Sequence, residues 1–297
     1  MHITTYKYFL TVSKVGSVRK AADILHISPS AISRQISCLE HNFKAKLIDR
    51  LASGIQLTEE GKILAHHMEK TIREIEIARS RIDEMNGTFS GTIHYATIEG
   101  VTKELLFPRI KEFKNSHENV RFSGKILGSD SVYDTIRSGE IDFGIVMDTK
   151  IPSDIEAIKY FDTRLSVVAP KSHPLATKKA IGLSELEGHE ITILNHKFLT
   201  RQIIEVATKG LGIELNIRFE LDSIEMIKHY IEGSNGVTIL PHFCVVEKDH
   251  SANLKSIKIN EDEMLKCFTI ICKKPGRHLI RAASCFIDEI CQFGTLA

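Results

Sequence analysis

The chain has 297 residues, of which 42% are hydrophobic and 26% charged, and its formal net charge is +1. This composition is typical of an ordinary soluble protein of roughly two domains. No stretch is long enough to span a membrane, and the N-terminus lacks the pattern of a signal peptide. Six scattered cysteines without a C-x-x-C pair favour reduced thiols over a disulfide framework, so we expect a cytoplasmic protein with no membrane partner.

The charge is distributed unevenly along the chain. Residues 1–57 hold eight Lys and Arg against three Asp and Glu, a net charge of +5, so the remainder carries −4 of the total +1. A small basic region joined to a larger, slightly acidic one indicates a nucleic-acid-binding domain attached to a domain of another kind.

The first elements predicted are three short helices. One covers about residues 4–15, and the stretch from Ser17 to Glu40 predicts two more that meet at a tight corner. Ser28 and Pro29 open the last of them as N-cap and first turn. Its buried stripe is Ile32, Ile36 and Leu39, and its outward residues are Ser30, Ser33, Arg34 and Ser37. The spacing alone leaves two interpretations open, a helix that reads DNA or an ordinary amphipathic hairpin.

Two short extended pieces follow, around a turn at Ser53 and Gly54, and predict a small β-wing beside the helices. The whole segment then resembles the N-terminal signature of the LysR-type transcriptional regulators. The residues that carry the resemblance are Phe9, Val12, Gly16, Ser17, Ala21, Ala22, Leu25, Ser28, Ala31, Ser33, Ile36, Leu39, Glu40, Leu47, Arg50, Leu57, Thr58 and Gly61.

The resemblance implies a winged helix-turn-helix domain over residues 1–58 that binds double-stranded operator DNA. Its expected contacts with DNA are Ser17, Ser28, Ser30, Ser33, Arg34, Ser37 and Arg50. Three positions depart from the family pattern, because Pro29 replaces a usual Gln, and Ser53 and Gln56 replace frequent arginines of the wing. Fewer wing cations should weaken the attraction to phosphate and its dependence on salt.

A long helix is predicted from Glu59 to about Met85, capped by Thr58. Its apolar residues recur at close to 3.5-residue spacing, which is typical of a two-chain coiled coil. The stripe comprises Leu64, Met68, Ile72, Ile75 and Ile82. The resemblance implies the same role, a dimerising linker helix and hinge over residues 59–89 in a dimer or tetramer.

Strands and helices alternate over residues 90–297, which predicts mainly parallel sheets with helices on both faces. This half resembles the LysR-type effector domain in residues 138–145, 165–170, 173–175 and 236–241. The resemblance implies an α/β domain of the periplasmic-binding-protein type, with lobe I at about 90–164 and 266–297 and lobe II at about 165–265. A small-molecule effector is expected between the lobes, and RNA polymerase is a further candidate partner.

The turns that follow the strands should line this cleft. The candidate effector-binding residues are Thr97, Ile98, Glu99, Gly128, Ser129, Val146, Met147, Asn195, His196 and Thr200. Hydroxyls and backbone amides at helix starts would receive an anionic or polar group. Ser129 and Thr200 have an alternative role, because each could simply cap its helix.

Glu99 stands where many members of the family have Ser or Thr. A carboxylate at the mouth of the cleft would repel anions and occupy helix-terminal donors. We therefore expect either an effector with a positive or hydrogen-bond-donating group, or a Glu99 that must be neutralised before an acid binds.

Two other classes of protein are alternatives to a regulator. An enzyme is disfavoured because the sequence has no G-x-S-x-G, P-loop or metal-ligand cluster, and we expect no cofactor. A secreted solute-binding protein would explain residues 90–297 but needs export and leaves residues 1–85 unexplained. Cys38, beside Leu39, is expected to be packed rather than reactive.

Overall fold

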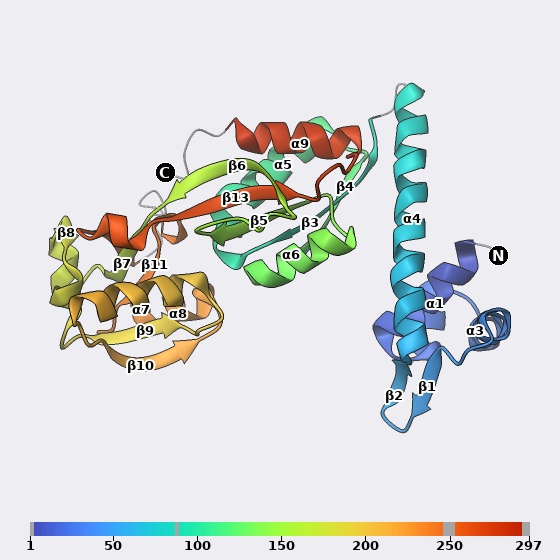
Figure 1. The fold of residues 1–297 in the computed structure, drawn as a ribbon, viewed down its shortest axis with the longest axis horizontal. Helices are drawn as coiled ribbons and strands as arrows, with labels where there is room; N and C mark the ends of the chain where they lie inside the picture. The colour runs from blue at the N-terminus through green and yellow to red at the C-terminus, as the bar shows by residue number, and fades with distance from the viewer. Residues whose placement is uncertain (1–2, 87–88, 246–252, 293–297) are drawn as a thin grey trace. The chain divides into compact units, whose positions relative to one another are not determined.

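The computed structural model describes residues 3–86, 89–245 and 253–292. The chain divides into two compact units, Met1–Gly87 and Thr88–Ala297 (Figure 1). The predicted fold class, a winged helix-turn-helix with a long helix followed by a two-lobed α/β domain, is confirmed. Within the described ranges, no helix combines the length and the apolar character that crossing a membrane requires.

The described part of the first unit, residues 3–86, contains four helices and a two-stranded antiparallel wing. Its elements are α1 (Ile3–Val15), α2 (Val18–Leu25), α3 (Pro29–Phe43), β1 (Ile48–Leu51), β2 (Gly54–Leu57) and α4 (Glu59–Met85). Fully buried Phe9, Ile32 and Met68 bring α1, α3 and α4 into one core. Ala21 and Ala22 are also buried, which allows α2 to approach closely.

Glycines fix the contact between the wing and the helices. The Gly16 carbonyl accepts a 2.8 Å hydrogen bond from the Ile55 amide, and Gly16 has a left-handed φ of 66°. A Cβ on Gly54 would lie 2.9 Å from the Gly16 oxygen, and one on Gly61 would lie 2.0 Å from the Leu47 oxygen. Only a residue without a side chain permits these approaches.

Lobe I of the second unit is a five-stranded sheet in the order β4-β3-β5-β13-β6. Its strands are β3 (Gly91–Thr97), β4 (Val120–Ile126), β5 (Phe143–Asp148), β6 (Glu156–Thr163) and β13 (Cys267–Lys273), and its helical elements are η1 (Glu99–Val101), η2 (Thr102–Leu106), α5 (Phe107–Ser116), α6 (Ser129–Ser138) and α9 (Arg281–Cys291). Helix α6 covers one face, where Val132 and Ile136 pack on Val146, and α5 and α9 cover the other (Figure 1).

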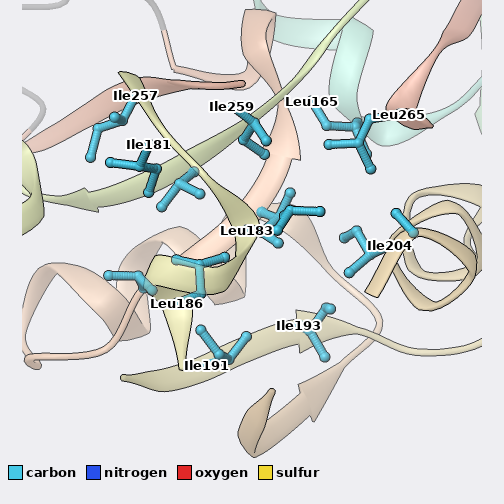
Figure 2. Packing of buried hydrophobic residues seen from close by; sticks show 14 of the residues in the cluster. Leu165, Ile181, Leu183, Leu186, Ile191, Ile193, Ile204, Ile257, Ile259 and Leu265 are labelled. Atoms are coloured by element: carbon cyan, nitrogen blue, oxygen red, sulfur yellow. The ribbon is translucent and has the colours of Figure 1, made fainter. Parts of the chain in front are cut away.

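Lobe II combines a four-stranded sheet, β11-β7-β12-β8, with the parallel pair β10-β9. Its elements are β7 (Leu165–Pro170), η3 (Pro174–Thr177), β8 (Ala180–Ile181), η4 (Leu183–Leu186), β9 (Glu190–Leu194), α7 (Leu199–Leu211), β10 (Asn216–Leu221), α8 (Ile224–Glu232), β11 (Thr238–Pro241), η5 (His242–Cys244), β12 (Leu254–Ile259) and η6 (Asp262–Leu265). Figure 2 shows its aliphatic core, in which Leu183, Ile193 and Ile204 are fully buried.

The prediction of mainly parallel sheets is wrong. Among the described residues of the second unit, four strand pairs are parallel and four are antiparallel. Each antiparallel pair includes β7 or β13. The chain enters lobe II from lobe I through β7, and it returns to lobe I through β13. Such a strand is not preceded by a helical crossover within its own sheet, so the rule for βαβ units does not set its direction.

Candidate functional site

The exposed face of α3 is polar and carries one cation. Ser30, Arg34 and Ser37 are exposed and spaced four and three residues apart, so they form one stripe along the helix, while Ser33 is half-buried. Among the described residues, no hydrogen bond or ion pair engages the Arg34 guanidinium, which is therefore available to an external partner. Cys38 is also exposed, so the expectation that it is packed is wrong.

The remaining predicted DNA-contacting residues lie at the two ends of this face. Ser28 caps α3 by accepting from the Ala31 amide at 3.3 Å, and its Oγ lies 3.1 Å from that of Ser30. Ser17 caps α2, accepting from the Lys20 amide at 3.4 Å. Arg50 is exposed on β1 of the wing. Ser28 and Ser17 thus each stabilise the start of a helix, a structural role that Arg34 and Arg50 do not have.

The predicted stripe of α4 divides into two parts. Met68 is 2% exposed and belongs to the core of the first unit, and Leu64 and Ile72 are partly buried against the same core. Ile75 and Ile82 are 41% and 58% exposed. Ile63, which is not part of the predicted stripe, is 63% exposed and lines a groove of about 460 Å³ with Tyr6, Phe43 and other residues. The spacing of these apolar residues does not show which of them pack in the core of the first unit and which stay exposed.

A cavity of about 780 Å³ lies where the elements of the two lobes meet. Lobe I contributes η1, the turn before α6 and the end of β5, and lobe II contributes the start of α7, the turn before α8 and the end of β11. Its lining residues are Ile98, Glu99, Gly100, Ile126, Leu127, Gly128, Ser129, Asp130, Ser131, Met147, Asp148, Leu194, Asn195, His196, Lys197, Phe198, Leu199, Thr200, Gln202, Asp222, Ile224, Pro241 and Phe243.

Eight of the ten predicted effector-binding residues line this cavity, and Thr97 and Val146 do not. Both are fully buried, because alternate residues of a strand face opposite sides of the sheet. Val146 packs against α6, whereas the next residue, Met147, faces the cavity. The Thr97 hydroxyl donates to the Ile98 carbonyl at 3.2 Å. The order of strands and turns predicts where each strand ends, but not which face of the sheet each of its last residues occupies.

Neither Ser129 nor Thr200 caps its helix. The N-cap of α6 is Gly128, and that of α7 is Phe198. The Ser129 hydroxyl donates to the Met147 carbonyl at 3.0 Å and accepts from the Met147 amide at 3.3 Å. Its proton is therefore already engaged, so Ser129 cannot donate to an effector while this bond persists. Thr200 lines the cavity on the first turn of α7, which has neither a side-chain cap nor an acidic residue.

The Glu99 carboxylate is engaged by protein groups. It accepts hydrogen bonds from Ser223 and from the first amides of α8, so it does occupy helix-terminal donors, as expected, whereas the expected repulsion of anions stays a prediction. Nothing in the sequence around Glu99 indicates that its partner lies on α8, more than a hundred residues away.

The cavity wall is acidic. Among the residues that the structure describes, four carboxylates line it, those of Glu99, Asp130, Asp148 and Asp222, against one lysine, Lys197. The Asp148 carboxylate accepts from the Tyr133 hydroxyl at 2.9 Å and from two backbone amides. Burial, and then the charge of Asp148, raise the pKa of Tyr133, which keeps that hydroxyl a donor. Asp130 and Asp222 have no such partner among the described residues.

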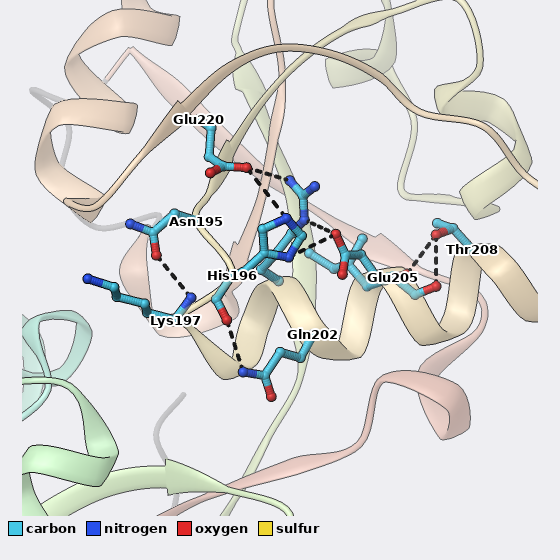
Figure 3. Close-up of polar contacts among 9 residues, drawn as sticks. Asn195, His196, Lys197, Gln202, Glu205, Thr208 and Glu220 are labelled. Carbon is cyan, nitrogen blue, oxygen red and sulfur yellow. Dashed lines mark hydrogen bonds and ion pairs between the residues drawn. The ribbon is translucent and has the colours of Figure 1, made fainter.

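A charged cluster holds the loop before α7 (Figure 3). The His196 Nδ1 lies 3.3 Å from Glu205 Oε1, and the His196 carbonyl accepts from Gln202 Nε2 at 3.0 Å. Arg201, 6% exposed, donates to Glu205 and lies 3.7 Å from the Glu220 carboxylate. The Arg201 hydrogen bond holds the pKa of Glu205 below its usual value. His196 is thus held at the cavity wall by Gln202, which also lines the cavity, and by Glu205, which does not.

The chain matches known families over both units. Residues 3–62 match the bacterial regulatory helix-turn-helix proteins of the lysR family, and residues 86–293 match the LysR substrate binding domain. The transcriptional dual regulator GltC of Bacillus subtilis (strain 168) is 28% identical over 296 residues, covering 99% of this chain and 97% of that protein.

Solved structures show the same fold. Full-length CbnR in complex with its target DNA gives a TM-score of 0.74 at 18% identity, covering 98% of this chain and 99% of that chain. The effector binding domain of QuiR in complex with shikimate gives 0.57 at 19% identity, covering 69% and 97%.

Proposed function

Because the chain belongs to the LysR family of bacterial transcriptional regulators, we propose that α3 reads operator DNA through Arg34 and its serines and that the interlobe cavity binds the effector. The protein is a DNA-binding transcriptional regulator with an effector-binding domain, and its relatives are regulators rather than enzymes. The observation that supports the first proposal is the exposed Ser30–Arg34–Ser37 stripe on a helix whose opposite side is fully packed.

A dimer would present two such helices to successive major grooves, about one helical turn or a multiple apart. The exposed Ile63, Ile75 and Ile82 of α4, together with the apolar groove beside Ile63, support self-association through this helix. Arg50 on the wing supplies a cation for the backbone beside the groove. The site of action would be the cytoplasm, where the chromosome lies.

The test is a gel-shift titration with the DNA upstream of the protein's own gene and a scrambled fragment of equal length, both at moderate salt. We expect specific retardation of the first fragment at concentrations that leave the second free. Equal binding of both fragments by folded protein would contradict the assignment of α3 as a reading helix.

The charge of the cavity supports a particular class of effector. With Glu99 engaged by α8, the carboxylates of Asp130 and Asp222 still face one lysine, so the wall attracts positive or hydrogen-bond-donating groups. The first turn of α7, with Thr200 and Lys197 nearby, offers donors to a polar acceptor group. We expect an effector that combines a donor or cationic group with an acceptor group at its other end.

Calorimetry of the full-length protein with matched amines, carboxylates and amino acids of equal chain length checks this class. Compounds bearing an amine should bind tighter than the matching acids, and Asp222→Asn should reduce that difference. Glu225→Gln, a nearby carboxylate that does not line the cavity, is the control. Tighter binding of simple acids, unaffected by Asp222→Asn, would contradict the proposed class without affecting the DNA-binding result.

A further inference from the structure

The Glu99 carboxylate crosses from one lobe to the other. Ser223 Oγ donates to its Oε1 at 2.9 Å, the Ile224 amide donates to Oε2 at 2.8 Å, and the Glu225 amide donates to Oε1 at 3.3 Å. Glu99 belongs to η1 of lobe I, and all three donors open α8 of lobe II. One side chain thus joins elements that are 124 to 126 residues apart in sequence.

These donors have no acceptor within their own helix. The first amides of any α-helix lack an intrahelical partner, and the positive end of the helix dipole favours a negative charge there. In α8 the Ser223 hydroxyl accepts from the Met226 amide at 3.4 Å, which leaves the Ile224 and Glu225 amides to Glu99. The cap of α8 is therefore completed by the opposite lobe.

The main chain that carries Glu99 is anchored in lobe I. The amide of the preceding residue, Ile98, donates to the Ile145 carbonyl of β5 at 3.1 Å. The Thr102 hydroxyl donates to the Glu99 carbonyl at 2.6 Å. Glu99 therefore cannot follow α8 if the lobes separate, and opening the cleft must break its hydrogen bonds.

Gly100 makes the contact possible. A Cβ at this position would lie 3.2 Å from Cys244 Sγ and from Ile224 Cδ1, and 3.4 Å from Phe243 Cε2. All three neighbours belong to lobe II. The absence of a side chain lets η1 lie directly against α8 and η5, which brings the Glu99 carboxylate within reach of the α8 amides.

We propose that Glu99 is an interlobe latch, a built-in carboxylate ligand of the α8 N-terminus that holds the two lobes together before any effector arrives. A cap supplied from within lobe II would stabilise α8 alone. A cap supplied from lobe I also holds the two lobes at one angle, because its hydrogen bonds can form only while η1 and α8 are in contact. The latch goes beyond the proposed function and requires no particular effector.

Hydrogen exchange of the full-length protein measures the latch directly. Since the Ile224 and Glu225 amides have no other acceptor among the described residues, their protection reports the Glu99 bonds. We expect Glu99→Gln to raise their exchange about tenfold, because a charge-assisted bond becomes a neutral one, and to raise exchange in residues 98–102 of lobe I as well. Glu225→Gln removes a carboxylate from the same helix end without crossing the cleft, because its side chain pairs with Lys228. It should leave residues 98–102 unchanged.

Chemical rescue separates the latch from general damage. In Glu99→Ala, the three donors face an open space that a small carboxylate can enter, so acetate should restore protection of the α8 amides, whereas chloride at equal ionic strength should not. Circular dichroism confirms that each variant is folded. Exchange that stays unchanged in Glu99→Gln, or that rises only in α8 and not in lobe I, would overturn the latch. A gel shift with the same variants tests the regulator assignment separately.

Discussion

The side-chain hydroxyls of Thr163 and Thr269 lie 2.8 Å apart, although 106 residues separate them in the sequence. Thr163 ends β6 at the point where the chain leaves lobe I, and Thr269 lies in β13, through which it returns. Both are almost fully buried, with exposed fractions of 2% and 0%. The hydroxyl pair therefore joins the two segments through which the chain crosses between the lobes.

Replacing either threonine by the isosteric valine should destabilise the protein, because the surviving buried hydroxyl loses its partner. For Thr163→Val we expect a loss of about 1–3 kcal/mol in the free energy of unfolding. Thr269→Val should be milder, since the Thr163 hydroxyl can still donate to the Phe161 carbonyl at 3.4 Å. The double variant should lose less than the sum of the two. Additive losses in denaturant titrations would mean that the hydroxyls do not interact.

Gly61 is the position of the first unit that should tolerate substitution least. An added Cβ would lie 2.0 Å from the Leu47 carbonyl oxygen, a backbone atom that cannot move without displacing the wing. We expect Gly61→Ala to lower the free energy of unfolding by about 3 kcal/mol or more. Gly210→Ala is the control, because its nearest neighbour would be Met264 Cε at 3.5 Å. This exposed site in α7 should gain about 0.5–1 kcal/mol, as helical glycines do. Equal effects in thermal melts would contradict the argument.

Glu40 ties the wing to α3. Its Oε1 accepts from the Leu47 amide at 3.0 Å and from the Ile48 amide at 3.4 Å, and both of those residues are buried. Glu40→Ala leaves two buried amides without an acceptor and should cost about 1–3 kcal/mol of stability. Because β1 carries Arg50, DNA affinity should fall as well. Glu40→Gln retains an acceptor oxygen and should recover part of both losses. Equal stability and equal DNA affinity of the alanine and glutamine variants, in denaturant titrations and gel shifts, would show that these two hydrogen bonds do not position the wing.

The features that local sequence could predict are those set by neighbouring residues. The Ser28 cap, the Thr58 cap of α4 and the buried stripe of α3 all follow from spacing, and the structure confirms them. The sequence does not predict β6 or β12 clearly, because lysines interrupt their apolar residues and several of their positions are only partly buried. The direction of β13 depends on a crossover from the other lobe, which no local pattern encodes.

The candidate effector site shows the same limit. The strand ends that approach the cavity could be predicted, because parallel strands end at one edge of a sheet. The faces of Thr97 and Val146 could not, since they depend on which side of β3 and β5 each helix covers. The partner of Glu99 lies on α8, and only the closure of two lobes brings the two together.

Arg34 should carry sequence discrimination. If its guanidinium makes a bidentate contact with a base, Arg34→Ala should weaken binding to the specific site by about 1–3 kcal/mol and leave non-specific binding almost unchanged. Arg218→Ala, an exposed arginine of lobe II, is the control. Fluorescence anisotropy on specific and scrambled duplexes measures both affinities. A uniform loss on all sequences, with a smaller salt dependence, would instead assign Arg34 to a phosphate.

His173 should make the stability of lobe II depend on pH. Burial, and then the neighbouring His189, lower its pKa below the ordinary 6.5, and its Nδ1 accepts from the Leu175 amide at 3.2 Å. The unfolded chain therefore binds a proton more readily than the folded one, so this contribution is intact above about pH 6.5 and is lost as the pH falls through the lowered pKa. In His173→Asn the side chain can still accept a hydrogen bond but does not titrate. This variant should therefore lose less stability than the wild type between about pH 7.5 and 5. The exposed His229→Asn is the control. Parallel stability curves for the wild type and His173→Asn would show that His173 does not titrate in this range.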